Sequence, residues 1–247
     1  MRYFLEIAYK GTAFHGWQVQ QNAYTIQEEI EQALKKLFSS AIEITASGRT
    51  DTGVHATQQF AHLNVEKEIT EDTIYKLNCM VGKDIVIKRA LRVKDNAHAR
   101  HDATSRTYEY RICTDKDPFL HGVTLFHAKP LNIPLMNEAA QVLYTHTDYQ
   151  SFSKVHTSVE HFLCNIYHAQ WQPQNNLLIF TIEANRFLRG MVRTIVGTLL
   201  EVGKEKLSLA DFEQIILSKD RKAAGMAVLP DGLFLTKVKY PEGVFIN

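Results

Sequence analysis

The chain has 247 residues, of which 45% are hydrophobic and 22% charged, values that are ordinary for a globular protein and argue against bulk disorder. This length allows one large domain or two small ones. Lysine and arginine number 28 against 27 acidic residues, so the formal net charge of +1 does not by itself indicate a nucleic-acid partner. Three scattered cysteines, Cys79, Cys113 and Cys164, argue against a disulfide framework and a cysteine-based zinc site.

The first predicted element is a strand over residues 2–9, where apolar side chains alternate with Phe4 as the exception. Glu6 and Lys10 interrupt the apolar run, so the segment is typical of neither a signal peptide nor a membrane span. No later apolar stretch approaches spanning length. We therefore expect a soluble, cytoplasmic protein with no membrane partner.

A helix is predicted over residues 26–38. Thr25 and Glu28 form the sequence pattern of a capping box at its start. Apolar side chains then follow at helical spacing, namely Ile26, Ile30, Ala33, Leu34 and Leu37.

The remaining elements mix both types along the chain. In the first half we predict strands at residues 42–46, 59–65, 85–93 and 106–113 and a helix at 71–81. In the second half we predict helices near 134–145, 187–201 and 209–218 and strands near 163–171, 177–184 and 233–240. Hairpin-like neighbours indicate an α+β fold with a mixed, largely antiparallel sheet flanked by helices. The polar stretch Lys94–Thr104 is the best candidate boundary, and it divides the chain into residues 1–98 and 99–247.

Basic residues gather in two places despite the balanced total. The first basic cluster consists of Lys88, Arg89, Arg92, Lys94, Arg100, Arg106 and Arg111. The second consists of Arg186, Arg189 and Arg193, with no acidic residue inside it. Such a patch can bind phosphates when the total charge is near zero, and the alternative is that both clusters are solvated surface.

The segment Gly48–Ala56 (GRTDTGVHA) places Asp51 between two glycines, directly after a predicted strand. Glycine lets a ligand approach the main chain closely. Arg49, two residues from Asp51, favours an ionised carboxylate suited to nucleophilic or charge-stabilising work at a sugar carbon. The residues alone also fit a turn in which Asp51 is a cap and Arg49 is solvated, since aspartate and glycine are common in turns.

The same segment closely resembles the GRTDAGVHA signature of the TruA family of tRNA pseudouridine synthases. Further motifs of that family follow in order over nearly the whole chain. In this chain the matching segments are the opening YKGTAFHGWQ at residues 9–18, TIQE at 25–28, HARHDA at 98–103, RTYEY at 106–110, FLRGMVR with IVG at 187–197, and AAG with GLFL at 223–235. One such motif is weak support, whereas six in sequence are strong support.

Three departures from the family pattern stand out. Ala97 and His101 replace two phenylalanines, and Gly82 stands where a proline is usual. The stretch Met226–Leu229 replaces one similar to Pro-Thr-Ala-Pro. These positions concern loops and RNA contacts.

The resemblance implies a role for each matching residue. Asp51 is the expected catalytic aspartate. Tyr108 is expected to stack on the target uracil, with its hydroxyl assisting proton removal from C5, and Arg193 is expected to pair with Asp51 and keep it ionised. We expect Arg49, Arg100, Arg106 and Arg189 to contact the substrate. On the residues alone, Tyr108 also fits a core aromatic on an alternating strand.

The resemblance further implies the pseudouridine synthase fold, with two similar subdomains around a cleft, and a homodimer. The expected substrate is the anticodon stem-loop of tRNA, at positions 38, 39 and 40. This isomerisation needs no metal and no small-molecule cofactor, so we expect neither. Two alternatives remain: an RNA-binding or RNA-chaperone protein on the same fold, and a base-exchanging tRNA glycosylase. The sequence leaves open which uridines react and whether Asp51 attacks C1′ or C6 or acts as a base at C2′.

Overall fold

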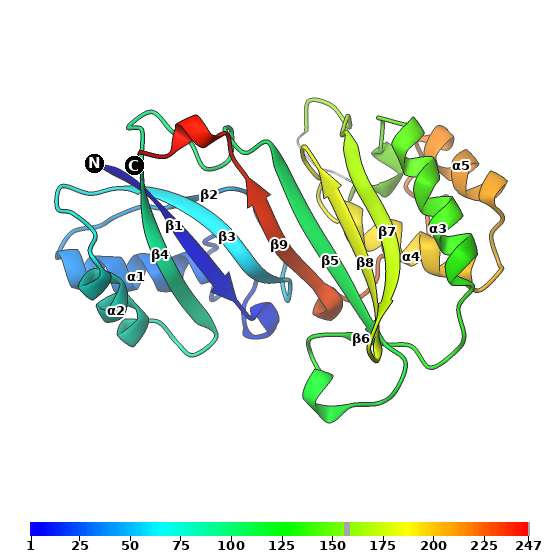
Figure 1. Ribbon diagram of the computed structural model, residues 1–247, viewed down its shortest axis with the longest axis horizontal. Coiled ribbons are helices and arrows are strands. Elements are labelled where there is room, and N and C mark those ends of the chain that lie inside the picture. Colours follow the sequence, from blue (N-terminus) through cyan, green and yellow to red (C-terminus); the bar gives the residue numbers. More distant parts are fainter. Residues whose placement is uncertain (156–158, 247) are drawn as a thin grey trace. The chain divides into compact units, whose positions relative to one another are not determined.

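The computed structural model describes residues 1–155 and 159–246, which contacts divide into two compact units. The first unit comprises Met1–Ser105 with Phe234–Asn247, and the second comprises Arg106–Leu233. The described residues form nine strands and five α-helices with mostly antiparallel pairing, which confirms the predicted α+β class (Figure 1). This division does not test the proposed subdomains 1–98 and 99–247, which stay a prediction.

The sheet of the first unit is built around the N-terminal strand. β1 (Arg2–Tyr9) lies between β3 (His55–Asn64) and β4 (Ile85–Val93) and is antiparallel to both. β9 (Leu233–Lys239) pairs parallel with β3, and the short β2 (Thr45–Ala46) pairs antiparallel with it. The bounds predicted for β1 and β4 are confirmed. β3 begins earlier than predicted and β2 is shorter.

Two helices belong to this unit and pack beside one another, α1 (Ile26–Phe38) and α2 (Glu71–Met80) (Figure 1). α1 has the predicted bounds, and the Thr25 hydroxyl caps it by accepting a hydrogen bond from the Glu28 N–H at 3.3 Å. Among the described contacts only this half of the predicted capping box forms, and the Glu28 carboxylate accepts from the Gln32 side chain at 3.4 Å.

Phe4 breaks the alternation of β1 because both faces of that strand are buried. Leu5 and Ile7 point to one face and are fully buried. Phe4 points to the other face, where its ring lies 5.1 Å from that of Tyr240 and 6.2 Å from that of Phe245. The C-terminal segment therefore covers this side of β1, which removes the polar face that a half-exposed strand would need.

Gly82 links the two helices of the first unit. Its N–H donates to the buried carboxylate of Glu29, on α1, and that carboxylate also accepts from the Tyr24 hydroxyl at 2.8 Å. Burial and the bond to Glu29 raise the pKa of Tyr24 to about 12. A proline has no N–H to donate, so this contact explains why glycine suits the position.

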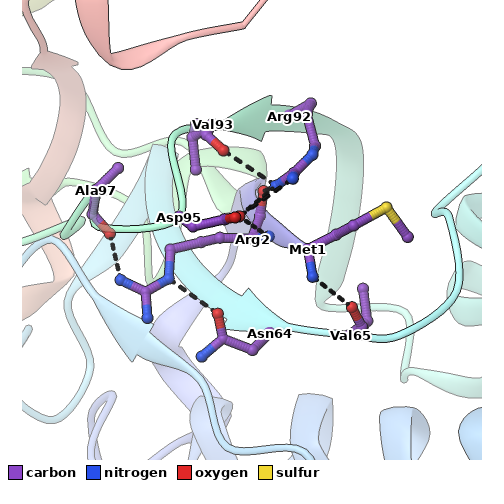
Figure 2. A network of polar contacts seen from close by, with 8 residues as sticks. All are labelled: Met1, Arg2, Asn64, Val65, Arg92, Val93, Asp95 and Ala97. Carbon is purple, nitrogen blue, oxygen red and sulfur yellow. Dashed lines mark hydrogen bonds and ion pairs between the residues drawn. The ribbon is translucent and has the colours of Figure 1, made fainter.

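The start of β1 is fixed by a polar network (Figure 2). Arg2 donates to the Asn64 side chain at 2.9 Å and to the Ala97 carbonyl at 2.8 Å. Arg92 donates to the Arg2 carbonyl at 2.7 Å and to the Asp95 carboxylate at 3.1 Å. These bonds hold the loop after β4 against β1, and they place the buried Ala97 directly at the network.

In the second unit, β8 (Leu177–Ala184) lies between β5 (Ser105–Cys113) and β7 (Ile166–Gln174), antiparallel to both. The two-residue β6 (Leu125–Phe126) pairs parallel with β5. The bounds predicted for β8 are confirmed, and β5 begins one residue before the predicted start.

Three helices complete the second unit and contact one another, α3 (Ile133–Val142), α4 (Met191–Gly203) and α5 (Leu209–Ser218). α4 is the core helix, and all its residues except Arg193 and Glu201 are buried. A nearly wholly buried helix leaves few positions for charge, so Arg193 stands out by its place in the fold.

Side chains satisfy the outer backbone groups of the peripheral strands. Asn78 of α2 accepts from the Ile87 N–H and donates to the Ile87 carbonyl, both at 2.8 Å. Asn137 of α3 makes the same pair of bonds to Trp171 of β7, at 2.8 and 3.0 Å. In each unit an asparagine on a helix thus occupies the place of a neighbouring strand.

Candidate active site

The predicted catalytic residues fall in both units. Asp51, Arg49 and Arg100 belong to the first unit. Tyr108, Arg193, Arg106 and Arg189 belong to the second unit. Each group is built by its own local contacts.

Asp51 lies in a tight turn between β2 and β3. The Val54 N–H donates to the Asp51 carbonyl at 3.1 Å and closes the turn. Gly53 has a φ of 79°, in the left-handed region that glycine adopts without strain. The Asp51 side chain is half-buried, whereas Arg49 is exposed. A carboxylate is thus held at the surface by its own backbone.

The segment after β1 supports this turn from behind. The Trp17 N–H donates to the Thr50 carbonyl at 3.1 Å, and the Gly53 N–H donates to the Phe14 carbonyl at 3.4 Å. The hydroxyls of Tyr9 and Thr50 are 2.8 Å apart, in a buried hydrogen bond. The two motifs that resemble family signatures at residues 9–18 and 48–56 are therefore one structural assembly.

Two glycines permit this close approach. A Cβ on Gly11 would overlap with the Val54 carbonyl oxygen. A Cβ on Gly16, which has a φ of 88°, would lie 2.7 Å from the Thr50 carbonyl oxygen. Any side chain at either position would push the Asp51 turn away from its support.

A buried glutamine, which we did not identify from the sequence, fixes the other end of the turn. Gln59 is fully buried, and its Nε2 donates to the Gly48 carbonyl at 2.9 Å. Its Oε1 accepts from the Ser47 hydroxyl. A glutamine at a core-facing position of a strand is the sequence signal that marks such a site, because buried polar groups require partners.

Arg100 lies in the turn after β4, beside a cluster of three histidine rings formed by His98 and His101 of the same turn and His62 of β3. The His62 and His98 rings are 4.6 Å apart, and those of His98 and His101 are 4.2 Å apart. His62 is buried, and burial together with the neighbouring His98 lowers its pKa to about 4. His101, which replaces a phenylalanine of the family pattern, keeps a flat ring exposed at this surface.

Tyr108 lies on β5, where it faces Ile182 of β8 in the sheet register. Its half-buried ring meets that of Phe187 edge-on, with centroids 5.2 Å apart. Arg106, two residues earlier on the strand, donates to the Asn185 carbonyl at 2.9 Å. The strand thus presents a positioned aromatic ring next to a guanidinium that is fixed to the segment following β8.

Arg189 and Arg193 do not share a helix, contrary to our prediction of a helix from residue 187. α4 begins at Met191, after Gly190 with a φ of 73°. This left-handed residue ends the preceding loop, so Arg189 lies in that loop, where its carbonyl accepts from the Lys154 N–H at 2.9 Å. Arg189 is exposed, and Arg193 is half-buried on α4.

A segment that we call the α4 strap, residues 221–232, crosses α4 next to Arg193. The Arg193 Nε–H donates to the Val228 carbonyl at 2.7 Å, and the Val228 N–H donates to the Arg193 carbonyl at 3.1 Å. The Gly225 N–H donates to the Thr198 hydroxyl at 3.0 Å. A Cβ on Gly197 would overlap with the Met226 carbonyl oxygen, so glycine on α4 lets the strap lie against the helix.

Several members of the first basic cluster are neutralised locally. Glu6 forms ion pairs with Lys88 and Arg89, at 3.8 and 2.7 Å. Arg92 pairs with Asp95 at 3.1 Å, and Arg111 pairs with Glu109 at 2.8 Å. The charges of these four residues are therefore partly offset within the protein.

Within residues 1–155 and 159–246, no group of three or more histidine, cysteine, aspartate or glutamate side chains is arranged to hold a metal ion. Among the helices that the structure describes, none combines the length and apolar character needed to cross a membrane.

Comparison with known proteins places the chain in a family. A family model described as tRNA pseudouridine synthase matches residues 7–102 and 139–241. A tRNA pseudouridine synthase A of Parabacteroides distasonis is 46% identical over 247 residues, covering 99% of this chain and 98% of the relative. Proteins of the same name from Azobacteroides pseudotrichonymphae and Colwellia psychrerythraea are 43% and 38% identical, and they cover 100% and 98% of this chain and 99% and 95% of their own lengths. The chain belongs to the tRNA pseudouridine synthase family.

Proposed function

We propose that this protein isomerises uridine to pseudouridine in tRNA, in the anticodon stem-loop at positions 38, 39 and 40. The observation that carries the proposal is the Asp51 turn. Its half-buried carboxylate sits on a backbone fixed by bonds from Trp17, Gly53 and Gln59. A fixed carboxylate costs little reorganisation during the reaction, which is what a catalytic group requires.

Asp51 is the proposed catalytic residue. The reaction breaks the N1–C1′ bond, turns the base and joins C5 to C1′. The C5 proton is lost and N1 gains a proton, so oxidation state and composition are unchanged. The carboxylate acts at C1′, at C6 or as a base at C2′, and in each route it is regenerated at the end.

Tyr108 and Arg193 are the proposed partners of that carboxylate. The Tyr108 ring offers a face for the extruded uracil, since base flipping costs a few kcal/mol that stacking offsets. Its hydroxyl assists the removal of the C5 proton. Arg193 supplies the positive charge that favours an ionised carboxylate. Arg49, Arg100, Arg106 and Arg189 are proposed to contact the RNA backbone.

The test compares Asp51→Ala, Asp51→Asn and Asp51→Glu with wild type, using tRNA that carries C5-tritiated uridine. Asp51 is one short side chain on a turn, so Asp51→Ala should bind tRNA within roughly tenfold of wild type. Tritium release should become undetectable in all three variants, because the first two lack a charge and the third displaces it. Filter binding on the same preparations separates affinity from catalysis.

The outcomes separate the candidate functions. Tritium release by Asp51→Ala would contradict the assignment of Asp51. A wild-type protein that binds tRNA and releases no tritium would instead be an RNA-binding protein on this fold. Mapping pseudouridine in the treated tRNA tests positions 38, 39 and 40.

Two further proposals rest on family membership alone. We propose that the protein acts in the cytoplasm and as a homodimer. Light scattering of the purified chain measures its mass in solution, and a monomer at the concentration of the activity assay would contradict the second proposal.

A further inference from the structure

One backbone carbonyl orients the guanidinium of Arg193. The bond from Nε to the Val228 oxygen is 2.7 Å long, which is short for a hydrogen bond donated by nitrogen. It uses only the Nε–H, so the two terminal nitrogens remain for bidentate pairing with an oxyanion. The direction in which these two terminal nitrogens point therefore depends on the position of the Val228 carbonyl.

The hydroxyl of Tyr110 fixes the residue that follows Val228. Tyr110 lies on β5, two residues after Tyr108, and is fully buried. Its hydroxyl donates to the Leu229 carbonyl at 2.8 Å. Burial raises the pKa of this hydroxyl above its usual range, so the group stays protonated and remains a donor.

The Tyr110 ring is itself held against the strap. A Cβ on Gly232 would lie 3.0 Å from Tyr110 Cζ and 2.6 Å from the Arg111 carbonyl oxygen, so the end of the strap contacts both ring and strand. Phenylalanine would keep this packing and lose only the hydroxyl. The Leu229 carbonyl would then lack its donor, and the strap would be free to shift relative to α4.

We propose that Tyr110 is a positioning residue that sets the orientation of Arg193 through the Leu229 and Val228 carbonyls. This inference rests on the proposed function, in which Arg193 assists the catalytic carboxylate. It adds a second role for β5, which presents Tyr108 to the substrate and steadies Arg193 through Tyr110. The strand thereby couples two groups that the reaction needs in fixed positions.

The test measures single-turnover pseudouridine formation by Tyr110→Phe at saturating enzyme, together with tRNA affinity and melting temperature. We expect a rate roughly tenfold lower, since misplacement of a catalytic group by about 1 Å costs up to about a hundredfold. Affinity for tRNA should stay within about twofold. The matched control is Tyr149→Phe, because Tyr149 is equally buried in the same unit and its hydroxyl also donates to a backbone carbonyl, that of Leu143. It should lower the melting temperature as much and leave the rate unchanged.

A double-mutant cycle identifies the route. Arg193→Lys keeps a charge and removes the guanidinium, so adding Tyr110→Phe to it should slow the reaction by less than about twofold. Equal slowing in both backgrounds would overturn the inference, as would equal rates for Tyr110→Phe and Tyr149→Phe. Wild-type rate in Tyr110→Phe combined with slow turnover in Arg193→Lys would overturn the inference and leave the proposed function intact. Wild type without pseudouridine formation would overturn the proposed function and this inference with it.

Discussion

Arg193 and Val228 exchange two hydrogen bonds, one from the arginine side chain and one to its backbone carbonyl. Both bonds require the α4 strap to lie against the helix, and Gly197 makes that approach possible. The core helix that carries Arg193 is thus held by a loop as well as by α3 and α5. This contact can be tested by a substitution that leaves every charged side chain unchanged.

Gly197→Ala should displace the strap and impair catalysis. The added methyl group would overlap with the Met226 carbonyl oxygen, which is backbone and cannot rotate away. We expect a stability loss of about 1–3 kcal/mol and a rate of pseudouridine formation at least about tenfold lower. Gly203→Ala on the same helix is the control, because its Cβ would first meet the flexible Met136 side chain. Urea unfolding and tritium release measure both effects, and equal behaviour of the two variants would contradict the prediction.

Tyr108→Phe should bind tRNA nearly normally and turn over slowly. Phenylalanine keeps the edge-on contact with Phe187 and the stacking face, and it removes the hydroxyl. Tyr108→Ala should be weaker in binding as well, because stacking of one base on an aromatic ring is worth about 1–3 kcal/mol. Single-turnover kinetics and filter binding compare the two variants. Turnover at the wild-type rate in Tyr108→Phe would remove the hydroxyl from the mechanism.

Affinity for tRNA should fall steeply as salt rises, even though the net charge is +1. Each phosphate contact that is lost should reduce the slope of log affinity against log salt by about one. Arg189→Gln should therefore flatten the slope, because Arg189 is exposed in the loop before α4. Arg89→Gln should change it little, since Arg89 already pairs with Glu6. Equal slopes for both variants and wild type would show that these arginines do not bind phosphate.

Gly82→Pro should destabilise the fold, although proline is usual in the family at this position. It removes the N–H that the buried Glu29 carboxylate accepts, at a cost of about 1–3 kcal/mol. In a Glu29→Ala background the same substitution should cost little, because the carboxylate is absent. Urea unfolding of the four proteins measures this coupling. A cost of Gly82→Pro that is the same in both backgrounds would contradict the assigned contact.

The free energy of unfolding should fall as pH decreases from about 6.5 to about 4 because of His62. The folded protein keeps this buried imidazole neutral, with a pKa lowered to about 4, and its Nδ1 accepts from the Ala99 N–H at 3.2 Å. Within that window the unfolded chain binds a proton that the folded chain does not, so acid favours unfolding, by at most about 1.4 kcal/mol per pH unit. His62→Asn keeps an acceptor and does not titrate.

Urea unfolding across that pH range compares His62→Asn with wild type. The stability of the variant should fall less steeply as the pH decreases. Part of the pH dependence that is left in the variant comes from His98, because burial also lowers the pKa of that imidazole. An identical slope in both proteins would show that His62 does not contribute.

Local patterns were sufficient to predict most elements and the Asp51 turn. The bounds of α1, β4, β8 and α5 follow from apolar spacing and from capping residues that act within a few positions. The start of α4 was predicted too early, because apolar side chains at helical spacing already occur at Phe187 and Leu188. The helix begins only after Gly190, whose left-handed backbone conformation is not visible in the apolar pattern. Tyr110, Gln59 and Val228 were missed because their roles depend on bonds to segments distant in sequence.

The two asparagine contacts, Asn78 with Ile87 and Asn137 with Trp171, have a consequence for self-association. At β7, the Tyr144 hydroxyl also bonds both backbone groups of Ala169, and Pro173 has no N–H to offer. The outward-facing backbone groups of Ala169 and Trp171 are therefore already hydrogen-bonded. A strand of a second chain could pair with them only after these bonds had broken. These bonds protect this edge of the sheet from fibre-like aggregation.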